Sequence, residues 1–243
     1  MNQRFTHIFY RIKDVLQLLC DRGRAKNAFL NYHLVRRKYI LSHACEHFDK
    51  NPLEPAPLLN HSLLHIGCGD SKLAEEMTFR GADVTVVDIG QDIIDNALKR
   101  AESTGAMVEF ILGSPEKLIQ EKRVFDIILC MDLFENVEHT SGFIKQIDQL
   151  LTEDGILIFS TNNRSISSFI WHIVFAQWVF KWVPKGTYNF KRFRPPHRLV
   201  EKLIDKGFVM EDLCGVYLDT TENRWKRKTQ VGARYLGAAK RKK

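Results

Sequence analysis

A short apolar run that ends in Gly-x-Gly constrains this chain more than any other feature of its sequence. Residues 63–66 (LLHI) lead into the turn 67–69 (GCG), and a second apolar run, 84–87, is closed by Asp88. In a doubly wound α/β domain, a buried strand feeds a glycine turn where the backbone approaches a cofactor. A carboxylate that ends the next strand accepts hydrogen bonds from ribose hydroxyls. The pattern therefore predicts a site for an adenosine-containing cofactor.

The third glycine of the dinucleotide fingerprint is absent from this turn. Asp70, Ser71 and Lys72 follow Gly69, so little here suits the pyrophosphate of a dinucleotide. The pattern favours S-adenosylmethionine (SAM) over NAD. Two alternatives remain open: the glycines form a structural turn without a ligand, and Asp88 caps the helix expected after it.

The rest of the chain alternates between short apolar runs and segments with helical spacing. Strands are expected at 62–66, 83–88, Val108–Leu112, Phe125–Met131 and 155–160, and helices at 71–80, 91–103 and 139–151. Strands separated by helices of this length form a parallel sheet with right-handed crossovers. The predicted fold class is therefore α/β and Rossmann-like.

The organisation along the chain follows from where this alternation starts and stops. Residues 4–48 are expected to be helical, and a proline-rich linker at 51–57 precedes the first strand. A helix is expected at 195–206, and residues 209–218 are expected to supply the last strands. We predict an N-terminal helical segment at 1–56, a cofactor-binding domain at 57–223 with an insert at 165–187, and a basic tail at 224–243.

Composition excludes several classes of protein. Of the 243 residues, 44% are hydrophobic and 27% are charged, as in ordinary globular proteins. The five cysteines are scattered without Cys-x-x-Cys spacing, which argues against a zinc site or a disulfide framework and favours a reducing compartment. No apolar run reaches the length needed to span a bilayer, and no signal peptide is visible. The net charge of +7 permits contact with an anionic membrane or with nucleic acid.

An aromatic stretch at 166–183 interrupts the alternation. It holds three tryptophans and three phenylalanines, and lysines and arginines follow it. Such a segment suits an interfacial position on a membrane. A buried core helix or a dimer interface is the alternative.

Polar residues follow the fourth expected strand, at the edge where parallel sheets bind ligands. Met131 ends that strand, and its side chain is expected either to pack on the cofactor or to belong to the core. Asp132, Glu135 and Asn136 come next. Three oxygen ligands at this spacing suit a hard cation such as Mg²⁺, which lowers the pKa of a bound hydroxyl. The alternative is a solvated loop and a helix cap.

Together these motifs resemble the ubiquinone biosynthesis O-methyltransferases, a family of class I SAM-dependent enzymes. The similarity extends from about residue 32 to about residue 223. Residues 182–188 are the most family-specific, because a generic SAM domain has no need of Val-Pro-Lys-Gly-Thr after an aromatic segment. The matching segments are 65–69 (HIGCG), 81–88 (GADVTVVD), 130–137 (CMDLFENV), 159–164 (FSTNNR) and 182–188 (WVPKGTY).

The resemblance implies a fold and a set of site residues. The fold would be the seven-stranded class I methyltransferase fold, with N-terminal helices and a membrane-associating insert at 165–187. The family's functional positions fall here on Arg36, Gly67, Asp88 and Met131 for the cofactor, on Asp132 and Glu135 for catalysis, and on Asp132, Glu135 and Asn136 for a weakened Mg²⁺ site.

The resemblance also implies an activity and a location. The enzyme would transfer a methyl group from SAM to a phenolic hydroxyl of a polyprenylated quinol or phenol, as a demethylubiquinol methyltransferase or a polyprenyl hydroxyphenol methylase does. Its partners would be that substrate, an anionic membrane surface and other ubiquinone-biosynthesis proteins, and no nucleic acid is expected. It would be cytoplasmic and peripheral on the inner membrane, or on the matrix side of the mitochondrial membrane in a eukaryote.

This sequence departs from the family pattern at a few positions. His65 stands where the family has an acidic residue, Asp70 stands where glycine is usual, and Asn136 replaces the metal-binding histidine. These departures leave open a non-catalytic paralogue that binds lipid or acts as a scaffold. The basic residues leave open an RNA methyltransferase.

Overall fold

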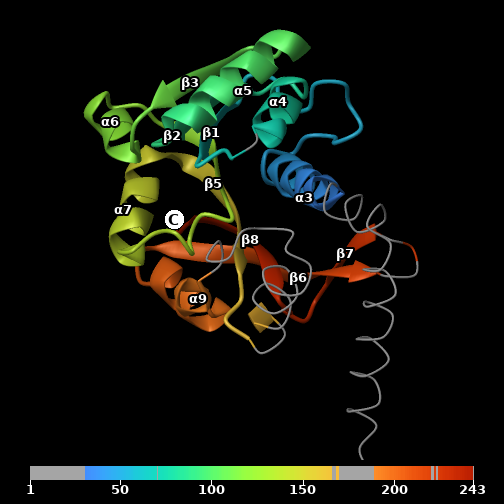
Figure 1. Ribbon diagram of the computed structural model, residues 1–243, viewed down its shortest axis with the longest axis vertical. Coiled ribbons are helices and arrows are strands. Elements are labelled where there is room, and N and C mark those ends of the chain that lie inside the picture. Colours follow the sequence, from blue (N-terminus) through green and yellow to red (C-terminus); the bar gives the residue numbers. More distant parts are fainter. Residues whose placement is uncertain are drawn as a thin grey trace, which may run out of the picture.

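One mixed sheet runs through the centre of the described structure (Figure 1). The computed structural model describes residues 31–69, 71–165, 168–169, 189–219, 222 and 224–242. Within them the sheet has eight strands in the order β3-β2-β1-β4-β5-β8-β6-β7. The strands are β1 (Ser62–Ile66), β2 (Asp83–Asp88), β3 (Val108–Leu112), β4 (Phe125–Met131), β5 (Leu151–Asn162), β6 (Phe208–Asp219), β7 (Arg224–Lys228) and β8 (Arg234–Arg241).

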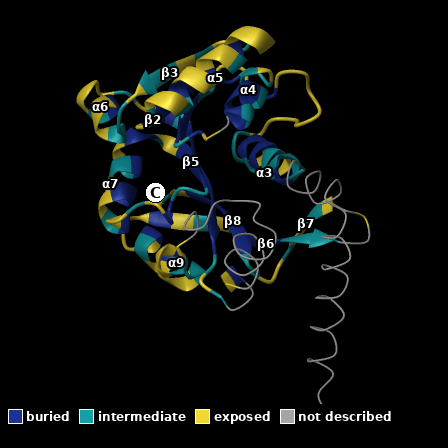
Figure 2. Ribbon diagram, in the orientation of Figure 1, coloured by how far each residue is buried: buried dark blue, intermediate teal, exposed yellow. Residues whose placement is uncertain are grey.

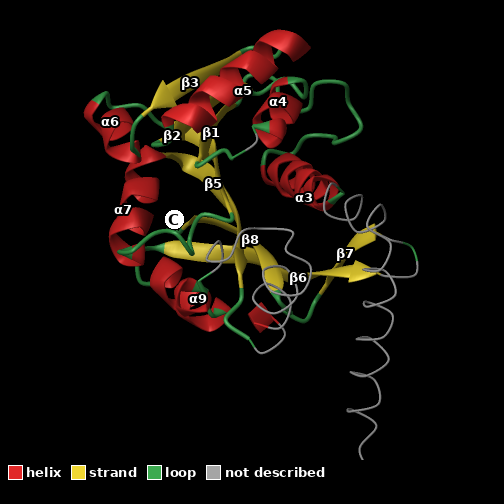
Figure 3. Cartoon of the chain, viewed as in Figure 1, coloured by secondary structure: helices red, strands yellow, loops and turns green. Residues whose placement is uncertain are grey.

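Helices cover both faces of the sheet (Figure 3). Those of one face are α3 (Tyr32–His47), α4 (Lys72–Thr78) and α5 (Gln91–Thr104). Those of the other face are α6 (Pro115–Gln120), α7 (Thr140–Leu150) and α9 (Pro196–Ile204). A short 3₁₀ turn, η2 (Phe190–Arg192), precedes α9. Among the described residues, no helix is long and apolar enough to cross a membrane.

Two hydrophobic cores lie between these helices and the sheet, because side chains alternate along each strand. On β4, Ile127 and Leu129 point into the core under α3, α4 and α5. Ile128 and Cys130 point into the core under α6, α7 and α9. All four are fully buried, and Figure 2 shows the dark band of buried sheet between exposed outer helix faces. Strands buried on both faces read as continuous apolar runs, which explains the sequence pattern.

The predicted α/β fold is confirmed, and most expected elements lie within a few residues of their predicted bounds. Strands β1 to β5 are parallel to one another. The helix predicted at 4–48 is described from Tyr32 to His47, and the part before residue 31 lies outside the described residues. Helix α6 was not predicted, because six residues are too few to show a helical repeat.

The basic tail expected at 224–243 is replaced by two strands. β7 forms an edge hairpin with β6, and β8 lies antiparallel between β5 and β6. The sheet therefore gains an eighth strand at the edge. Its C-terminal basic residues belong to the fold: the Arg241 guanidinium bonds the Asp148 carboxylate at 2.8 Å, and Lys240 Nζ lies 2.7 Å from Glu211 Oε1.

Strand β8 was not predicted from the sequence because of its composition. Its buried centre contains Gly237, Ala238 and Ala239, which are poor strand formers. The packing requires such small residues, because Gly237 pairs with Phe159 of β5 and the Phe159 ring lies over it. A Cβ at residue 237 would come within 2.3 Å of Phe159 Cζ.

Substituting Gly237→Ala is expected to lower the free energy of unfolding by about 1–3 kcal/mol, the usual cost of overpacking a core. The Phe159 ring is fully buried against Phe134 and Tyr235 and has no free space to enter. Urea unfolding followed by circular dichroism measures the change. Gly142→Ala in α7 is the matched control, since its Cβ would meet nothing closer than 3.9 Å. That variant is expected to gain up to about 1 kcal/mol from helix propensity. Equal stabilities for the two variants would contradict this account of β8.

Candidate active site

The order of the strands reverses between β1 and β4, and this switch point locates the site. In open α/β sheets, ligands bind outside the carboxyl ends of the strands at such a point. The carboxyl ends of β1, β2, β4 and β5 meet at this edge. Because β8 is antiparallel, its first residue, Arg234, reaches the same edge opposite Asn162.

The glycine turn after β1 has the backbone geometry that the sequence predicted. Gly67 has a φ of +67°, and its N–H donates to the Val87 carbonyl at 2.9 Å. A Cβ at this position would lie 2.9 Å from Leu133 Cδ1, the end of a flexible side chain, so it is mainly the positive φ that requires glycine. Asp70, which stands where the family usually has glycine, lies outside the described residues.

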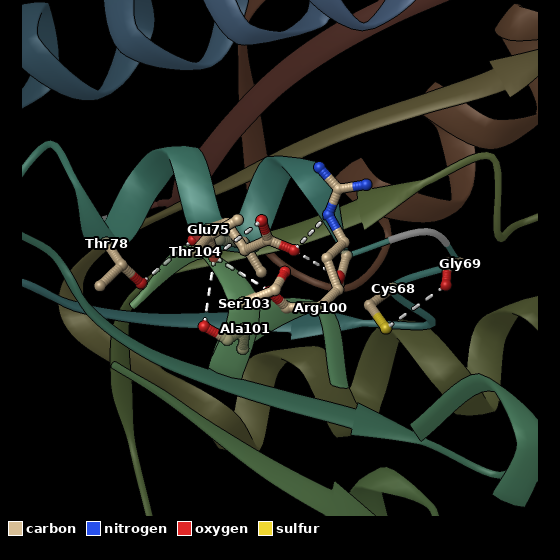
Figure 4. Close-up of polar contacts among 10 residues, drawn as sticks. Cys68, Gly69, Glu75, Thr78, Arg100, Ala101, Ser103 and Thr104 are labelled. Atoms are coloured by element: carbon tan, nitrogen blue, oxygen red, sulfur yellow. Dashed lines mark hydrogen bonds and ion pairs between the residues drawn. The ribbon is translucent and has the colours of Figure 1, made fainter. Parts of the chain in front are cut away.

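A buried carboxylate of α4, that of Glu75, is bound by residues of α5 close to the turn (Figure 4). Glu75 of α4 is 3% exposed and accepts hydrogen bonds from Ser71 Oγ at 2.8 Å and from Arg100 Nε at 2.6 Å. Ser71 has a φ of +58° directly before α4, so this network holds a strained residue where the helix begins. The roles of Glu75 and Arg100 were not predictable from the sequence, because the two residues bind each other from different helices.

Asp88 ends β2 at the edge where the prediction placed it. Its side chain is largely buried, and Oδ1 accepts the Gly90 N–H at 2.9 Å. That contact fixes the carboxylate just before α5, whose N-cap is Gly90, so the alternative in which Asp88 caps the helix is wrong. Among the described residues, no donor bonds Oδ2, which leaves one oxygen for a ligand hydroxyl. Met131, at the end of β4, is 5% exposed and packs in the core under α3, α4 and α5.

Asp132 is held in an uncommon backbone conformation. Its φ is +52°, and its N–H donates to both the carbonyl and the Oγ of Ser160 at 2.9 Å. Ser160 Oγ in turn donates to Asp132 Oδ1 at 2.9 Å. Left-handed conformations of residues other than glycine cluster at functional sites, where the surrounding structure stabilises them. Ser160 thus fixes the direction of the Asp132 carboxylate.

Two arginines share the other oxygen of Asp132. Arg36 Nη1 of α3 lies 3.3 Å from Asp132 Oδ2, and Arg234 Nη1 of β8 lies 3.8 Å from the same atom. Both guanidinium groups also stack on the ring of Tyr32, each 4.8 Å from its centroid. Burial, followed by the charge of Asp132, raises the pKa of Tyr32 to about 12, so its hydroxyl stays neutral. Arg234 was missed from the sequence because it was assigned to a tail.

The carboxylate of Glu135 is bound by residues of β5 and not by the two arginines. Its carboxylate accepts hydrogen bonds from Asn162 Nδ2 at 2.7 Å and from Thr161 Oγ1. The side chain is buried, and burial together with the charge of Asp132 raises the pKa of Glu135 to about 7. The structure thus brings Asp132 and Glu135 near each other but gives their carboxylates different partners.

His65 brings two unpaired buried nitrogens to the site. It is 1% exposed, and neither ring nitrogen has a hydrogen-bond partner among the described residues. Burial, assisted by the charge of Arg36, lowers the pKa of His65 to about 3, so the imidazole is neutral. Arg36 Nε is likewise buried without a partner there. Unpaired buried groups at a candidate site point to a ligand that satisfies them.

The predicted Mg²⁺ ligands do not fit a divalent cation in this arrangement. Glu135 is turned to β5, Asn136 donates its amide to the Asp132 carbonyl at 3.5 Å, and Asp132 is bound by two guanidinium groups. Like unit charges 4 Å apart repel by about 4 kcal/mol at an effective dielectric constant of about 20. In the part of the chain that the structure describes, no three His, Cys, Asp or Glu side chains are placed to hold a metal.

Arg194, one of the basic residues that follow the aromatic stretch, forms hydrogen bonds within the fold. Its Nε donates to the Phe134 carbonyl at 3.0 Å and its Nη2 donates to the Val137 carbonyl. It thereby fixes the loop that carries Asp132 and Glu135. Its own N–H donates to the Asn162 carbonyl at 3.0 Å, so the chain returns after residue 189 to the carboxyl end of β5.

Known proteins share this arrangement of strands. A family model described as a methyltransferase domain matches residues 64–159. The solved structure of magnesium protoporphyrin IX methyltransferase from Synechocystis PCC 6803 has a TM-score of 0.60 at 16% identity, covering 93% of this chain and 98% of that one. A SAM-dependent methyltransferase from Clostridium acetobutylicum has a TM-score of 0.59 at 15% identity, covering 90% and 99%. The chain thus has the fold of a class I SAM-dependent methyltransferase.

Sequence similarity narrows this class. Ubiquinone biosynthesis O-methyltransferases of Pelagibacter ubique and of a Methylobacterium strain are 31% and 30% identical to this chain. They cover 85% and 95% of it, and the matches span 85% and 93% of their own lengths. The chain belongs to the ubiquinone biosynthesis O-methyltransferase family. The family and the enzyme class expected from the sequence, a SAM-dependent O-methyltransferase, are confirmed.

The raised pKa of Glu135 gives the protein a measurable pH dependence of stability. A carboxyl group whose pKa is about 7 when folded, against an ordinary value of 4.5, keeps its proton longer in the folded state. The unfolded chain loses that proton first, so stability falls as the pH rises from about 4.5 to about 7. Glu135→Gln removes this effect, and its unfolding free energy relative to wild type is expected to rise between pH 5 and pH 8.

Urea unfolding at several pH values tests this expectation. Glu138→Gln is the control, because Glu138 lies exposed on the same loop. That variant is expected to follow the wild-type pH dependence throughout. A constant difference between Glu135→Gln and wild type would show that burial does not hold the proton on Glu135.

Proposed function

We propose that this enzyme transfers a methyl group from SAM to a phenolic oxygen of a polyprenylated quinol or phenol in ubiquinone biosynthesis. One observation carries the proposal: the glycine turn, Asp88 and the fixed carboxylate of Asp132 converge on the switch point of the sheet. The named relatives at about 30% identity support the choice of pathway.

The residues at the switch point fit the cofactor. Gly67 lets the backbone approach, and Asp88 offers Oδ2 to a ribose hydroxyl while Oδ1 stays on the Gly90 N–H. The buried Nε of Arg36 and the neutral His65 ring supply unpaired polar atoms near the expected methionine end. SAM, when bound there, supplies an electrophilic methyl group on a sulfonium sulfur. Met131, at the end of β4 and largely within the core, is proposed to pack against the apolar part of the cofactor.

The chain contributes mainly positioning to the reaction. Ser160 fixes the Asp132 carboxylate, and Arg194 fixes the loop behind it. Holding a substrate oxygen in line with the methyl group removes much of the entropic cost of a reaction between two molecules. Asp132 and Glu135 are proposed in separate roles. Asp132 is partly exposed and lies at the substrate side, whereas the buried Glu135 braces β5 behind it.

The segment 165–187 is proposed to bring the site to a membrane. Most of it lies outside the described residues, but Phe169 near its start and Phe190, just past its end, are described. The rings of Phe169 and Phe190 lie 5.2 Å apart, and the Arg194 N–H returns to Asn162. The segment therefore leaves and rejoins the fold at the same edge as the site, which supports a role in reaching a lipid-soluble substrate.

The corresponding location is peripheral, on an anionic membrane surface. In a bacterium this is the cytoplasmic face of the inner membrane, and in a eukaryote the matrix side of the mitochondrial membrane. Other ubiquinone-biosynthesis proteins that handle the same polyprenylated intermediates are the proposed protein partners.

Asp88→Asn is expected to weaken SAM binding at least tenfold. The amide oxygen still accepts the Gly90 N–H, but the variant loses a charge-assisted hydrogen bond, worth about 1.5–3 kcal/mol. Isothermal titration calorimetry with SAM measures the dissociation constant. Asp92→Asn is the control, because Asp92 lies exposed in the first turn of α5. Equal affinities for wild type and Asp88→Asn would remove Asp88 from the cofactor site.

Turnover tests the proposed substrate directly. The purified protein, SAM and a short-chain demethylated quinol are expected to yield the O-methylated quinol, detected by mass spectrometry. An Asp88→Asn sample with raised SAM measures whether the defect is one of binding. A folded protein that binds SAM but methylates no quinol, with or without added Mg²⁺, would instead support the scaffolding paralogue.

A further inference from the structure

A group of four residues around Asp132 carries more positive than negative charge. Arg36 and Arg234 contribute two positive charges and Asp132 one negative charge, which leaves +1 beside a neutral Tyr32. Arg36, Asp132, Arg234 and Tyr32 are called here the guanidinium cluster. The side chains of Arg36 and Arg234 are 17% and 10% exposed, so water reaches little of this charge.

The cluster is rigid as well as charged. Its arginines come from α3 and β8, and both stack on the Tyr32 ring, which also lies 4.9 Å from the Trp225 ring. Ser160 fixes Oδ1 of Asp132, so Oδ2 stays between the two guanidinium groups. Preorganised charge of this kind stabilises a developing anion without rearrangement.

We propose that the guanidinium cluster binds the ionised phenolic oxygen of the substrate, with Arg234 as the contacting residue, so that methyl transfer needs no divalent cation. The inference rests on the proposed function and deepens it. The same position in the sequence was expected to bind Mg²⁺, and the two guanidinium groups occupy the surroundings that such an ion would need. Arginine presents several donors in a fixed plane, which suits an oxyanion.

The chemical step balances without a metal. The phenolic O–H bond breaks and its proton passes to solvent water, leaving an oxyanion next to Arg234. An oxygen lone pair then forms the O–C bond to the methyl carbon as the C–S bond breaks. The electron pair of that bond remains on sulfur, which becomes a neutral thioether. A nearby positive charge lowers the pKa of the phenol, so more of it is ionised at neutral pH.

The first experiment compares activity with and without divalent cations. Wild-type protein treated with EDTA is expected to keep its activity within about twofold, and added Mg²⁺, Mn²⁺ or Zn²⁺ is expected to give no stimulation. Activity that EDTA abolishes and Mg²⁺ restores would overturn the proposal.

The second experiment changes Arg234. Arg234→Gln is expected to lower kcat/KM for the quinol about 100-fold, as loss of one preorganised donor does, with SAM affinity within about threefold of wild type. The pH at which kcat reaches its plateau is expected to rise by about one unit, because the phenol loses its neighbouring charge. Arg234→Lys is expected to recover part of the rate, and millimolar guanidinium is expected to rescue Arg234→Gln.

Arg227→Gln is the matched control. Arg227 also stacks on a tyrosine of α3, with its guanidinium carbon 5.5 Å from the Tyr39 ring centroid, and lies on the neighbouring hairpin. It is expected to keep wild-type kcat, KM and pH profile. An Arg234→Gln variant whose SAM affinity falls as much as its kcat/KM, with an unshifted pH profile, would assign Arg234 to the cofactor and overturn the proposal.

A binding measurement separates this inference from the proposed function. A nitrocatechol absorbs in the visible range when ionised, so its spectrum reports its protonation without turnover. Wild-type protein is expected to bind it as the anion below its pKa in solution, and Arg234→Gln is expected to bind it as the neutral form. If no quinol is methylated yet the anion is bound, the substrate is wrong and the cationic site stands. If the neutral form is bound by wild type, the cationic site is wrong.

Discussion

The antiparallel pairing of β8 between β5 and β6 is the constraint on which the site depends. Without it, the carboxyl edge of the sheet would end at β5, and the pair of arginines at Asp132 would lose Arg234. The pairing requires small residues at the centre of β8, because Phe159 covers Gly237 from the neighbouring strand. It also places Tyr235 where its hydroxyl donates to the Arg194 carbonyl at 2.9 Å, next to the loop that carries Asp132. The strand β8 thus fills the core, completes the sheet and supplies Arg234 to the site.

Burial decides what each charged residue near the site does. Asp132 and Glu135 are three residues apart and chemically alike, yet one is bound by guanidinium groups and the other by neutral donors. Asp132 therefore lies in a positive environment, while burial raises the pKa of Glu135 to about 7. The same reasoning separates the basic residues. Arg194 and Arg241 bind carbonyls and a carboxylate of the fold, so these two side chains are not available to a membrane.

Sequence reasoning located the parts of the site that are local in the chain. Gly67 and Asp88 follow apolar strands directly, so their position at the edge of a parallel sheet was predictable from spacing alone. The position of Arg234 was not predictable from spacing. Its strand is rich in basic and small residues, and its partners lie about a hundred residues or more away in the sequence. The pair Glu75 and Arg100 was not predicted for a similar reason, because only the packing of two helices brings these residues together. Spacing also suggested three converging metal ligands, whereas hydrogen bonds to β5 turn one of them away.

The order in which the strands appear along the chain has a consequence for synthesis. β5 and β6 are both complete by residue 219, but the strand that belongs between them ends at residue 241. Until β8 has been made and has folded, the facing edges of β5 and β6 have backbone groups without their pairing partner. Exposed strand edges are templates for pairing with other chains. Mispairing with other chains is therefore most favoured in the interval before β8 takes its place between β5 and β6.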